Sequence, residues 1–197
     1  APTGVPFAYS YIAYPIVDET LRIITACSVK TNVSGQVKIK VAKGNPFVAL
    51  SSDELAAVKS YCDIKFAAGI TYIVTSNDAD RLYIKATIWY QGSYSAIIQT
   101  SVIDALNNFL QVRSQIDFDG SIKMSDVEGA IRNVPGVNDV VLENVRGRAD
   151  ATAFVDGIDL IALQQVQSRL YNSLAGYVVQ EDTSGKTFAD TLTFIAQ

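Results

Sequence analysis

Residues 125–145 read SDVEGAIRNVPGVNDVVLENV, and this order of residues constrains the fold more than any other segment of the 197-residue chain. Ser125 and Glu128 have the spacing of a capping box, in which each side chain satisfies a free backbone N–H of the first helical turn. Pro135-Gly136 then ends the helical pattern, because proline lacks a backbone N–H and glycine adopts a left-handed conformation. The segment predicts a strand over residues 139–145, after a helix whose inward face is formed by Val127, Ala130, Ile131 and Val134.

The residues before this helix predict the rest of a small unit. Residues 82–90, LYIKATIWY, alternate between two faces, as a strand does in a sheet with one partly solvated side. A turn at 91–93 leads into a helix at 95–112, and residues 118–124, FDGSIKM, predict a turn and a short strand. We therefore expect residues 79–148 to form a β-α-β-α-β sub-domain with helices on one face of a sheet. The apolar stripe of the first helix is expected to contain Ile98, Val102, Ala105 or Leu106, and Phe109.

Residues 21–78 predict a second, smaller sub-domain. A strand at 21–31, turn residues at 32–35 and an alternating strand at 37–41 indicate a hairpin with one solvated face, where lysines such as Lys40 are expected to serve solubility. Ser51 and Glu54 have capping-box spacing at the start of a helix. The strand that follows is expected at 70–75, and the polar run SNDAD at 76–80 indicates the boundary between the sub-domains. The stripe that packs this helix on the sheet consists of Leu55, Val58 and Cys62.

The two ends of the chain complete the predicted organisation. Residues 1–20 are rich in proline and tyrosine and predict an extended arm that lies over the body or over a neighbour. Residues 149–197 predict a helix at 159–174 and a terminal hairpin in which 177–182 and 191–197 are the strands. The fold class is therefore predicted to be α+β, with two small sub-domains of mixed sheets, helices packed on one face, and a C-terminal helix and β-hairpin.

Charge and composition argue against several classes of protein. The chain has 16 basic and 20 acidic side chains and a net charge of −4, whereas binding to a phosphate backbone needs clustered positive charge. Its apolar runs are far shorter than the ~20 residues that cross a bilayer. We therefore expect neither nucleic-acid binding nor a membrane span. The first residue is Ala rather than Met, which indicates a processed or excised piece.

Histidine is absent, which removes the commonest general base and the commonest metal ligand. Cys27 and Cys62 have no metal-site or redox spacing, so we expect them to be small buried apolar residues. Gly185-Lys186-Thr187 resembles the end of a phosphate-binding loop but lacks the earlier glycine and is expected between two strands. We expect no catalytic, cofactor-binding or metal-binding residue and no small-molecule substrate.

Carboxylates leave an alternative open. Asp117, Asp119 and Glu128 fall at positions of a calcium-loop count, but the sixth position needs glycine and holds Ile122. Gly92-Ser93 followed by acidic residues is typical of nucleotidyltransferases, although the position paired with Asp104 is a leucine. The alternative hypothesis is a magnesium-dependent nucleotide enzyme of nucleotidyltransferase type that uses Asp104, Asp117 and Asp119.

Such a chain could also function through contacts with other proteins. Tyrosine buries a large area at low entropic cost, so tyrosines on the arm are candidate interface groups, with packing on the chain's own core as the alternative. Arginines on the loop after residue 145 could pair with a partner's charges or with groups nearby. The exposed strand of the terminal hairpin is a site for edge pairing. The interface candidates are Tyr9, Tyr11, Tyr14, Arg146, Arg148 and Tyr177.

The run RLYIKATIWYQGSYS, the helix at 95–112 and FDGSIKMSDVEGAIRNVPGVNDVVLENV together resemble the C-terminal domains of baseplate J-like proteins from contractile phage tails. In that family a strand ending near a Tyr-x-Gly turn, a helix, a Gly-containing turn before a short strand, and a helix closed by Val-Pro-Gly-Val before a final strand recur in this order. The segments SSDELAAVKSYCD and AAGITYIVTSNDAD are also similar, so the resemblance covers residues 35–148. Its most specific part is GSIKMSDVEGAIRNVPGVNDV.

The resemblance implies a structural wedge component of the baseplate in a phage, a prophage or a related contractile injection machine. Its partners would be other baseplate and tail proteins in an oligomeric assembly, and its location would be the virion or, during assembly, the bacterial cytoplasm. No catalytic residue is carried over, so the protein is expected not to be an enzyme. Family members are often longer at the N-terminus, which agrees with the missing Met. A third hypothesis is a secreted binding module.

Overall fold

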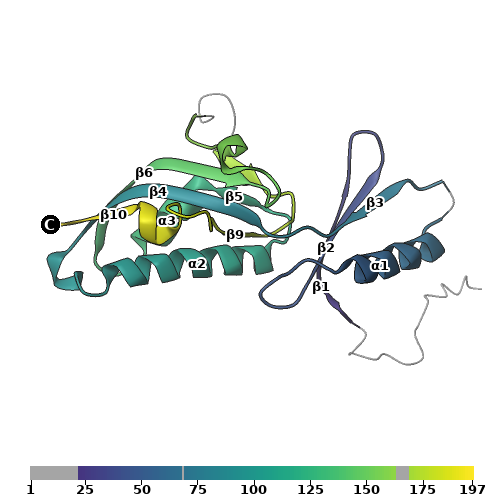
Figure 1. Cartoon of the computed structure of the whole chain (residues 1–197), viewed down its shortest axis with the longest axis horizontal. Helices are drawn as coiled ribbons and strands as arrows, with labels where there is room; N and C mark the ends of the chain where they lie inside the picture. The colour runs from purple at the N-terminus through teal and green to yellow at the C-terminus, as the bar shows by residue number, and fades with distance from the viewer. Residues whose placement is uncertain (1–21, 68, 163–168) are drawn as a thin grey trace, which may run out of the picture.

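The described chain contains three β-sheets, and the two larger ones each have a helix layer and a cluster of buried side chains of their own. The computed structural model describes residues 22–67, 69–162 and 169–197. Figure 1 shows the two sheets side by side along the long axis, with the smaller one formed by the N-terminal part of the described chain. The predicted α+β class, with mixed sheets and helices, is confirmed.

The smaller sheet has the strand order β1-β2-β3. Strands β1 (Ile24–Thr31) and β2 (Val37–Lys43) form the predicted antiparallel hairpin, and β3 (Tyr72–Thr75) runs parallel to β2. Helix α1 (Ser52–Lys65) connects β2 to β3, and its capping box of Ser51 and Glu54 is confirmed. Leu55, Val58 and Cys62 pack into the core of this sheet, as their spacing predicts.

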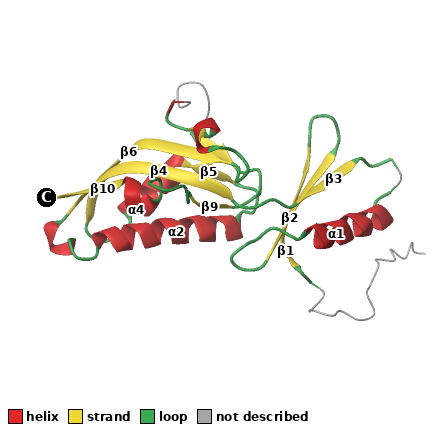
Figure 2. Ribbon diagram, viewed as in Figure 1, coloured by secondary structure: helices red, strands yellow, loops and turns green. Residues whose placement is uncertain are grey.

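The larger unit contains the predicted β-α-β-α-β order of elements, but the middle strand, β5, is not part of the sheet of β4 and β6 and pairs instead with β8 (Leu170–Asn172) in a separate two-stranded sheet. Strand β4 (Asp80–Tyr90) is followed by the 3₁₀ turn η2 (Gly92–Tyr94), α2 (Ile98–Ile116), β5 (Ser121–Lys123), α3 (Met124–Arg132) and β6 (Val137–Arg148). Strands β4 and β6 pair antiparallel over almost their full length, and Figure 2 shows α2 running along the sheet beneath them. One face of β4 is fully buried, and α2 covers it with Ile98, Val102, Leu106 and Leu110.

Gly136 makes the turn between α3 and β6 possible. Its φ is +91°, and a Cβ at this position would lie 2.4 Å from the ring of Tyr94. Only glycine therefore allows both the left-handed conformation and the close approach of the Tyr94 ring. This contact joins the turn after β4 to the turn before β6.

The predicted capping box of Ser125 and Glu128 is wrong. Helix α3 begins one residue earlier, at Met124, and its N-cap makes no side-chain hydrogen bond. Met124 is fully buried and its N–H donates to the carbonyl of Arg169, while Glu128 forms an ion pair with Arg169 at 3.0 Å. Contacts with a segment far along the chain thus determine where the helix starts, and they outweigh the local cap.

The helix predicted at 159–174 is also wrong over its described parts. After the 3₁₀ turn η3 (Phe154–Asp156), residues Ile158–Asp159 form β7 beside β6, and Leu170–Asn172 form β8 beside β5. Residues 163–168 lie outside the described chain. In β8, the backbone N–H and C=O groups find their hydrogen-bond partners in β5 rather than within a helix. Tyr171, in the middle of β8, is buried.

The terminal hairpin is replaced by a different pairing. Strands β9 (Val178–Gln180) and β10 (Leu192–Ala196) both pair with β4 in parallel, at 80–82 and at 86–90, and not with each other. The short helix α4 (Phe188–Thr191), capped by Thr187 and Asp190, lies between them. Phe188 is completely buried, which anchors α4 to the sheet. The C-terminal residues thus complete one edge of the larger sheet.

Candidate functional site

The two sheets meet at a junction that contains several of the residues singled out in the sequence. The loop between β2 and α1 places Phe47 against the larger unit, where its ring lies edge-on to Phe118 at 5.6 Å and to Tyr177 at 5.9 Å. Phe118 and Tyr177 stack at 6.3 Å. We call these three rings the aromatic junction. Small side chains, among them Ala42 and Ala175, fill the space around it.

Asp119 ties both strands of the small hairpin to the larger unit. Its carboxylate accepts hydrogen bonds from Lys40 at 2.5 Å and from Ser28 at 2.9 Å, and it pairs with Lys30 at 2.9 Å. Burial opposes the charge, but these hydrogen bonds outweigh it and hold the pKa of Asp119 below its ordinary value. Lys40 also donates to the carbonyl of Ser173, so its role is structural and the expectation of simple solubility is corrected.

Asp119 also has an unusual backbone, which places the carboxylate. It is the one non-glycine residue of the described chain with a positive φ, +66°, a conformation that aspartate tolerates better than most residues. Its N–H donates to the carbonyl of Gly176 at 2.7 Å. The turn after α2 is thereby held against the segment before β9.

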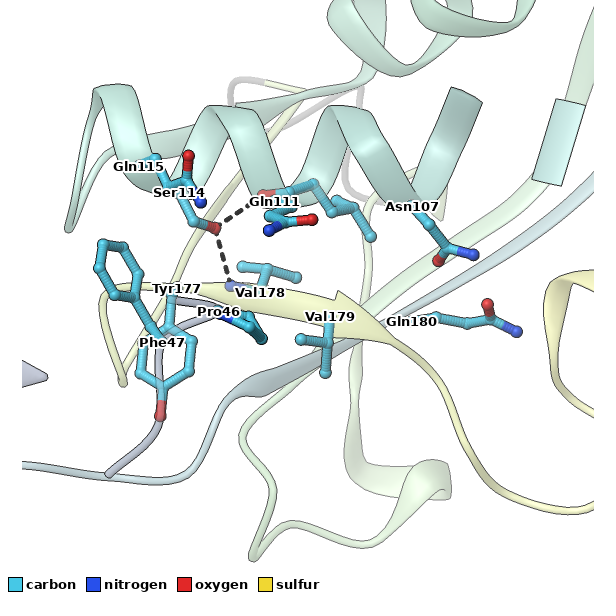
Figure 3. Close-up of a pocket in the computed structure, with 11 residues that line it drawn as sticks. Pro46, Phe47, Asn107, Gln111, Ser114, Gln115, Tyr177, Val178, Val179 and Gln180 are labelled. Carbon is cyan, nitrogen blue, oxygen red and sulfur yellow. Dashed lines mark hydrogen bonds between the residues drawn. The ribbon is translucent and has the colours of Figure 1, made fainter. Parts of the chain in front are cut away.

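A cleft lies beside the aromatic junction, between α2, β9 and the loop at Pro46 (Figure 3). Its volume is about 200 Å³, below the roughly 300–1,000 Å³ of typical ligand pockets. Ser114 bridges two of its walls, because its hydroxyl donates to the carbonyl of Leu110 and accepts from the N–H of Val178. None of the described residues that line the cleft is charged, and the polar groups are mainly the amides of Asn107, Gln111, Gln115 and Gln180. The cleft offers no general acid or base.

Arg148 belongs to the interior of the larger unit rather than to an interface. Its guanidinium binds both carboxylate oxygens of Glu181, at 2.6 Å and 2.7 Å, and the two side chains are only 9% and 1% exposed. Burial would raise the pKa of Glu181, but hydrogen bonds from Arg148 and Thr183 lower it to about 2. The same pair raises the pKa of Arg148. This side chain offers no surface to a partner, so its predicted interface role is corrected.

The other interface candidates divide into three cases. Tyr177 is buried in the aromatic junction, its hydroxyl donates to the carbonyl of Asn77, and burial raises its pKa to about 12, so its interface role is also corrected. Arg146 is partly exposed and is held by its own chain, with its guanidinium 5.2 Å from the ring centroid of Phe154 and 3.6 Å from Asp159. Tyr9, Tyr11 and Tyr14 lie outside the described residues.

The carboxylates of the alternative hypothesis do not converge on one site. Asp104 is exposed on α2, and Asp117 follows the end of that helix thirteen residues later, which is about 20 Å along the axis. Asp119 is already bound by two lysines. Within the ranges that the structure describes, no three His, Cys, Asp or Glu side chains are grouped as a metal site requires.

Two further expectations about chemistry need correction. Thr187 does precede a helix, contrary to the prediction, but α4 has only four residues and its first N–H groups are capped by Thr187 and Asp190. Cys62 is buried as expected, whereas Cys27 is exposed on β1, and both thiols are free. Burial raises the pKa of Cys62. Neither observation places a reactive group in a cleft.

The sequence interpretation missed Asp80, which was assigned to the polar break. It is fully buried, and its carboxylate accepts hydrogen bonds from the Tyr171 hydroxyl at 2.6 Å and from the N–H groups of Leu174 and Ala175. Burial raises its pKa despite these partners. A signal was present: residue 80 is in phase with Leu82 and the other buried positions of the alternating strand.

Comparison with known proteins leaves the family open, since no family model and no curated protein matches the chain. Among the described residues, no helix has the length and apolar character needed to cross a membrane.

Proposed function

We propose that the protein is a structural component of a contractile-tail baseplate, a wedge assembly protein that acts through contacts with other baseplate and tail proteins. One observation carries this proposal. The elements β4, α2, β5, α3 and β6 follow one another in the order that the resemblance to baseplate J-like proteins implies, with Gly92 after β4 and the Val-Pro-Gly-Val turn before β6. In the Val-Pro-Gly-Val turn, which belongs to the most specific motif, Gly136 leaves the space that the Tyr94 ring occupies.

The arrangement of charged groups supports a role in assembly rather than catalysis. The most buried carboxylates, Asp80, Asp119 and Glu181, are all bound by groups of the chain itself. The cleft at the aromatic junction is small and uncharged. We propose that the protein is not an enzyme and works in the virion or, during assembly, in the bacterial cytoplasm.

Reconstitution with the products of neighbouring genes tests the proposal. We expect the chain to form a stoichiometric complex when it is co-expressed with tail tube, sheath, spike and baseplate proteins, measured by native mass spectrometry and imaged by electron microscopy. A specific interface should bury about 1,000 Å² or more. Deletion of residues 1–15 is expected to abolish the complex while the fluorescence of Trp89, the single tryptophan, stays native.

The same experiment includes outcomes that contradict the proposal. Neighbouring genes unrelated to tails, or a chain that binds none of the tail proteins, would count against a baseplate role. A nucleotide-dependent rise in melting temperature with magnesium would favour the nucleotidyltransferase alternative, and a signal peptide in the full reading frame would favour a secreted module. Deletion of 177–197 is not a useful variant, because it would remove β9 and β10 from the sheet.

A further inference from the structure

The described chain is built around two separate hydrophobic cores. The core of the small unit, residues 22–75, contains only side chains between positions 24 and 74, and the core of the larger unit, residues 80–197, contains only side chains between positions 82 and 194. The chain passes from one unit to the other once, through residues 76–79 between β3 and β4. Because each unit has a core of its own, each can stay folded when the other changes position.

The contact between the two units is made by side chains. Among the described residues, no hydrogen bond between backbone groups joins the two units, and their strands belong to different sheets. The buried apolar side chains that the units share are only Ala42, Ala175 and Tyr177, with Phe47 and Phe118 partly buried beside them. A contact of this kind resembles a transient interface between proteins, for which relative motion is the ordinary expectation.

Two cavities lie between the units, so this contact is not closely packed. The cleft of about 200 Å³ is lined by Pro46 and Phe47 of the small unit and by α2 and β9 of the larger unit (Figure 3). A second cavity, of about 540 Å³, is lined by Lys43 and Leu50 on one side and by residues such as Leu174 on the other. Close-packed protein interiors contain few voids larger than a water molecule. The units therefore have room to change their relative position without disturbing either core.

Asp119 makes the charged contacts that close this junction. Its carboxylate pairs with Lys40 at 2.5 Å and with Lys30 at 2.9 Å, and these are the only ion pairs of the described residues that cross from one unit to the other. Its backbone carbonyl also accepts a hydrogen bond from Lys30 at 2.7 Å. The Asp119 side chain is only 7% exposed, and hydrogen bonds between charged groups are stronger than neutral ones. Both lysines lie on the hairpin of the small unit, so one residue of the larger unit holds both of its strands.

We propose that the small unit swings as a rigid body about residues 76–79 and that Asp119 is the latch that holds it against the larger unit. Opening of the latch separates Phe47 from the rings of Phe118 and Tyr177 and leaves both cores intact. Figure 1 shows the units side by side along the long axis of the molecule, so a rotation between them changes the distance from α1 to α2. The inference concerns the fold alone and does not depend on the proposed baseplate role.

Two substitutions in the full chain remove the latch from its two sides. Asp119→Asn removes the charge and keeps a residue that tolerates the φ of +66°, and Lys40→Gln removes the closest cation of the hairpin. The matched control is Asp117→Asn, since Asp117 is exposed and pairs with Arg113 inside the larger unit. Either latch variant should lower the ratio of closed to open molecules by about tenfold or more, as expected for the loss of one hydrogen bond between charged groups. The control should leave this ratio unchanged.

Distances between two spin labels, measured by pulsed electron paramagnetic resonance, report the position of the small unit. One label is attached to Cys27, which is exposed on β1, and the other to Asn108→Cys on the exposed surface of α2, while Cys62 is buried. The labelled wild type and the labelled control should each give one narrow distance, and both latch variants should give a broad distribution. Hydrogen exchange of the β1 and β2 amides and the fluorescence of Trp89 should stay native throughout, because both cores persist.

Three results would overturn the proposal. The first is a narrow, wild-type distance in both latch variants, and the second is an equally broad distribution in the control. The third is loss of hydrogen-exchange protection in β1 and β2 of both latch variants, which would show that the small unit unfolds instead of swinging. If only Asp119→Asn fails to fold, Lys40→Gln decides the outcome. Binding of tail proteins is measured separately, so the proposed function can fail or hold whatever the position of the small unit.

Discussion

Glu181→Gln is the substitution whose effect on stability follows most directly from the structure. It removes the charge of a carboxylate that is 1% exposed and leaves Arg148, 9% exposed, with only the more distant and more exposed carboxylate of Asp182 at 3.8 Å. The amide of glutamine can accept one of the two hydrogen bonds but cannot offset the buried guanidinium charge. We expect the larger unit to lose stability because the charge of Arg148 then lacks its close, buried partner.

The magnitude can be estimated in two ways. Removing one partner of a buried ion pair typically costs about 3–5 kcal/mol. The pKa of Glu181 is about 2, against an ordinary value of 4.5, and this difference corresponds to about 3 kcal/mol of stability at neutral pH. Because the folded-state pKa is lowered, this stability is present above pH 4.5 and is lost as the pH falls towards 2. Domains of this size have about 5–15 kcal/mol in total.

Urea unfolding followed by Trp89 fluorescence measures the effect in the relevant unit, because the single tryptophan lies on β4. The matched control is Glu143→Gln, which breaks a pair with Lys85 whose side chains are 36% and 51% exposed. Exposed pairs contribute about 0–1 kcal/mol. We therefore expect a large loss for the buried position and a small one for the control at pH 7.

The pH dependence gives the sharper comparison. The wild type and Glu181→Gln should differ by about 3 kcal/mol at pH 7 and converge as the pH falls below 4, while other titrating groups affect both proteins alike. Equal losses for Glu181→Gln and Glu143→Gln, or a difference that does not change with pH, would refute the assignment of Glu181 as a buried, charged partner of Arg148.

Three other substitutions test separate parts of the structure. Asp119→Asn should loosen the contact between the sheets and lower the free energy of unfolding by about 1–3 kcal/mol at neutral pH, measured by urea titration and by limited proteolysis of the small unit. Because the folded-state pKa of Asp119 is lowered, the stability of the wild type should approach that of the variant only as the pH falls below the ordinary pKa of aspartate. Gly136→Ala should lower the free energy of unfolding by more than about 1 kcal/mol, since the position has a positive φ and the added methyl group would meet the Tyr94 ring. The control is Gly129→Ala, where nothing lies near the added methyl group, and thermal melting should show this variant to be as stable as the wild type or more stable. Phe188→Ala should lower the free energy of unfolding by about 3–5 kcal/mol and increase the rate of amide hydrogen exchange in β10. An unchanged exchange rate would show that α4 does not hold that strand in place.

The elements that could be predicted from the sequence are those whose cause is local. The alternation of residues 82–90 defines the buried face of β4, and helical spacing defines the buried stripe of α2, although Leu110 rather than Phe109 completes it. The capping box of Ser51 and Glu54 forms because both groups lie within one turn of α1. In each case the hydrogen bonds and the side-chain directions depend on neighbours within a few residues.

The errors have a common physical origin, which is pairing between segments far apart in the chain. Residues 170–172 form a strand because β5 is available beside them, and leucines with helical spacing did not reveal this partner. The start of α3 is determined by burial of Met124 and by contacts with Arg169, about forty residues later. No local pattern contains this information.

The same reason explains why the site residues were only partly predicted. The sequence indicated that Arg148 and Tyr177 have defined contacts but not that these contacts are internal, because Glu181 and Phe47 are distant in sequence. Asp119 was singled out for metal chemistry, yet its partners Lys30 and Lys40 come from the other sheet. Asp80 could have been recognised as buried from its phase in the strand.

The pairing of β9 and β10 with β4 means that the larger folded unit does not end at residue 148. Strand β4 is central only because residues 178–180 and 192–196 occupy its second side, and the pair of Arg148 and Glu181 joins the end of β6 to the segment after β9. A chain ending at residue 148 would expose that whole side of β4 and leave Arg148 unpaired. Residues 149–197 therefore fold with residues 79–148 as one unit, in which β9 and β10 form one border of the sheet and β6 with β7 forms the other.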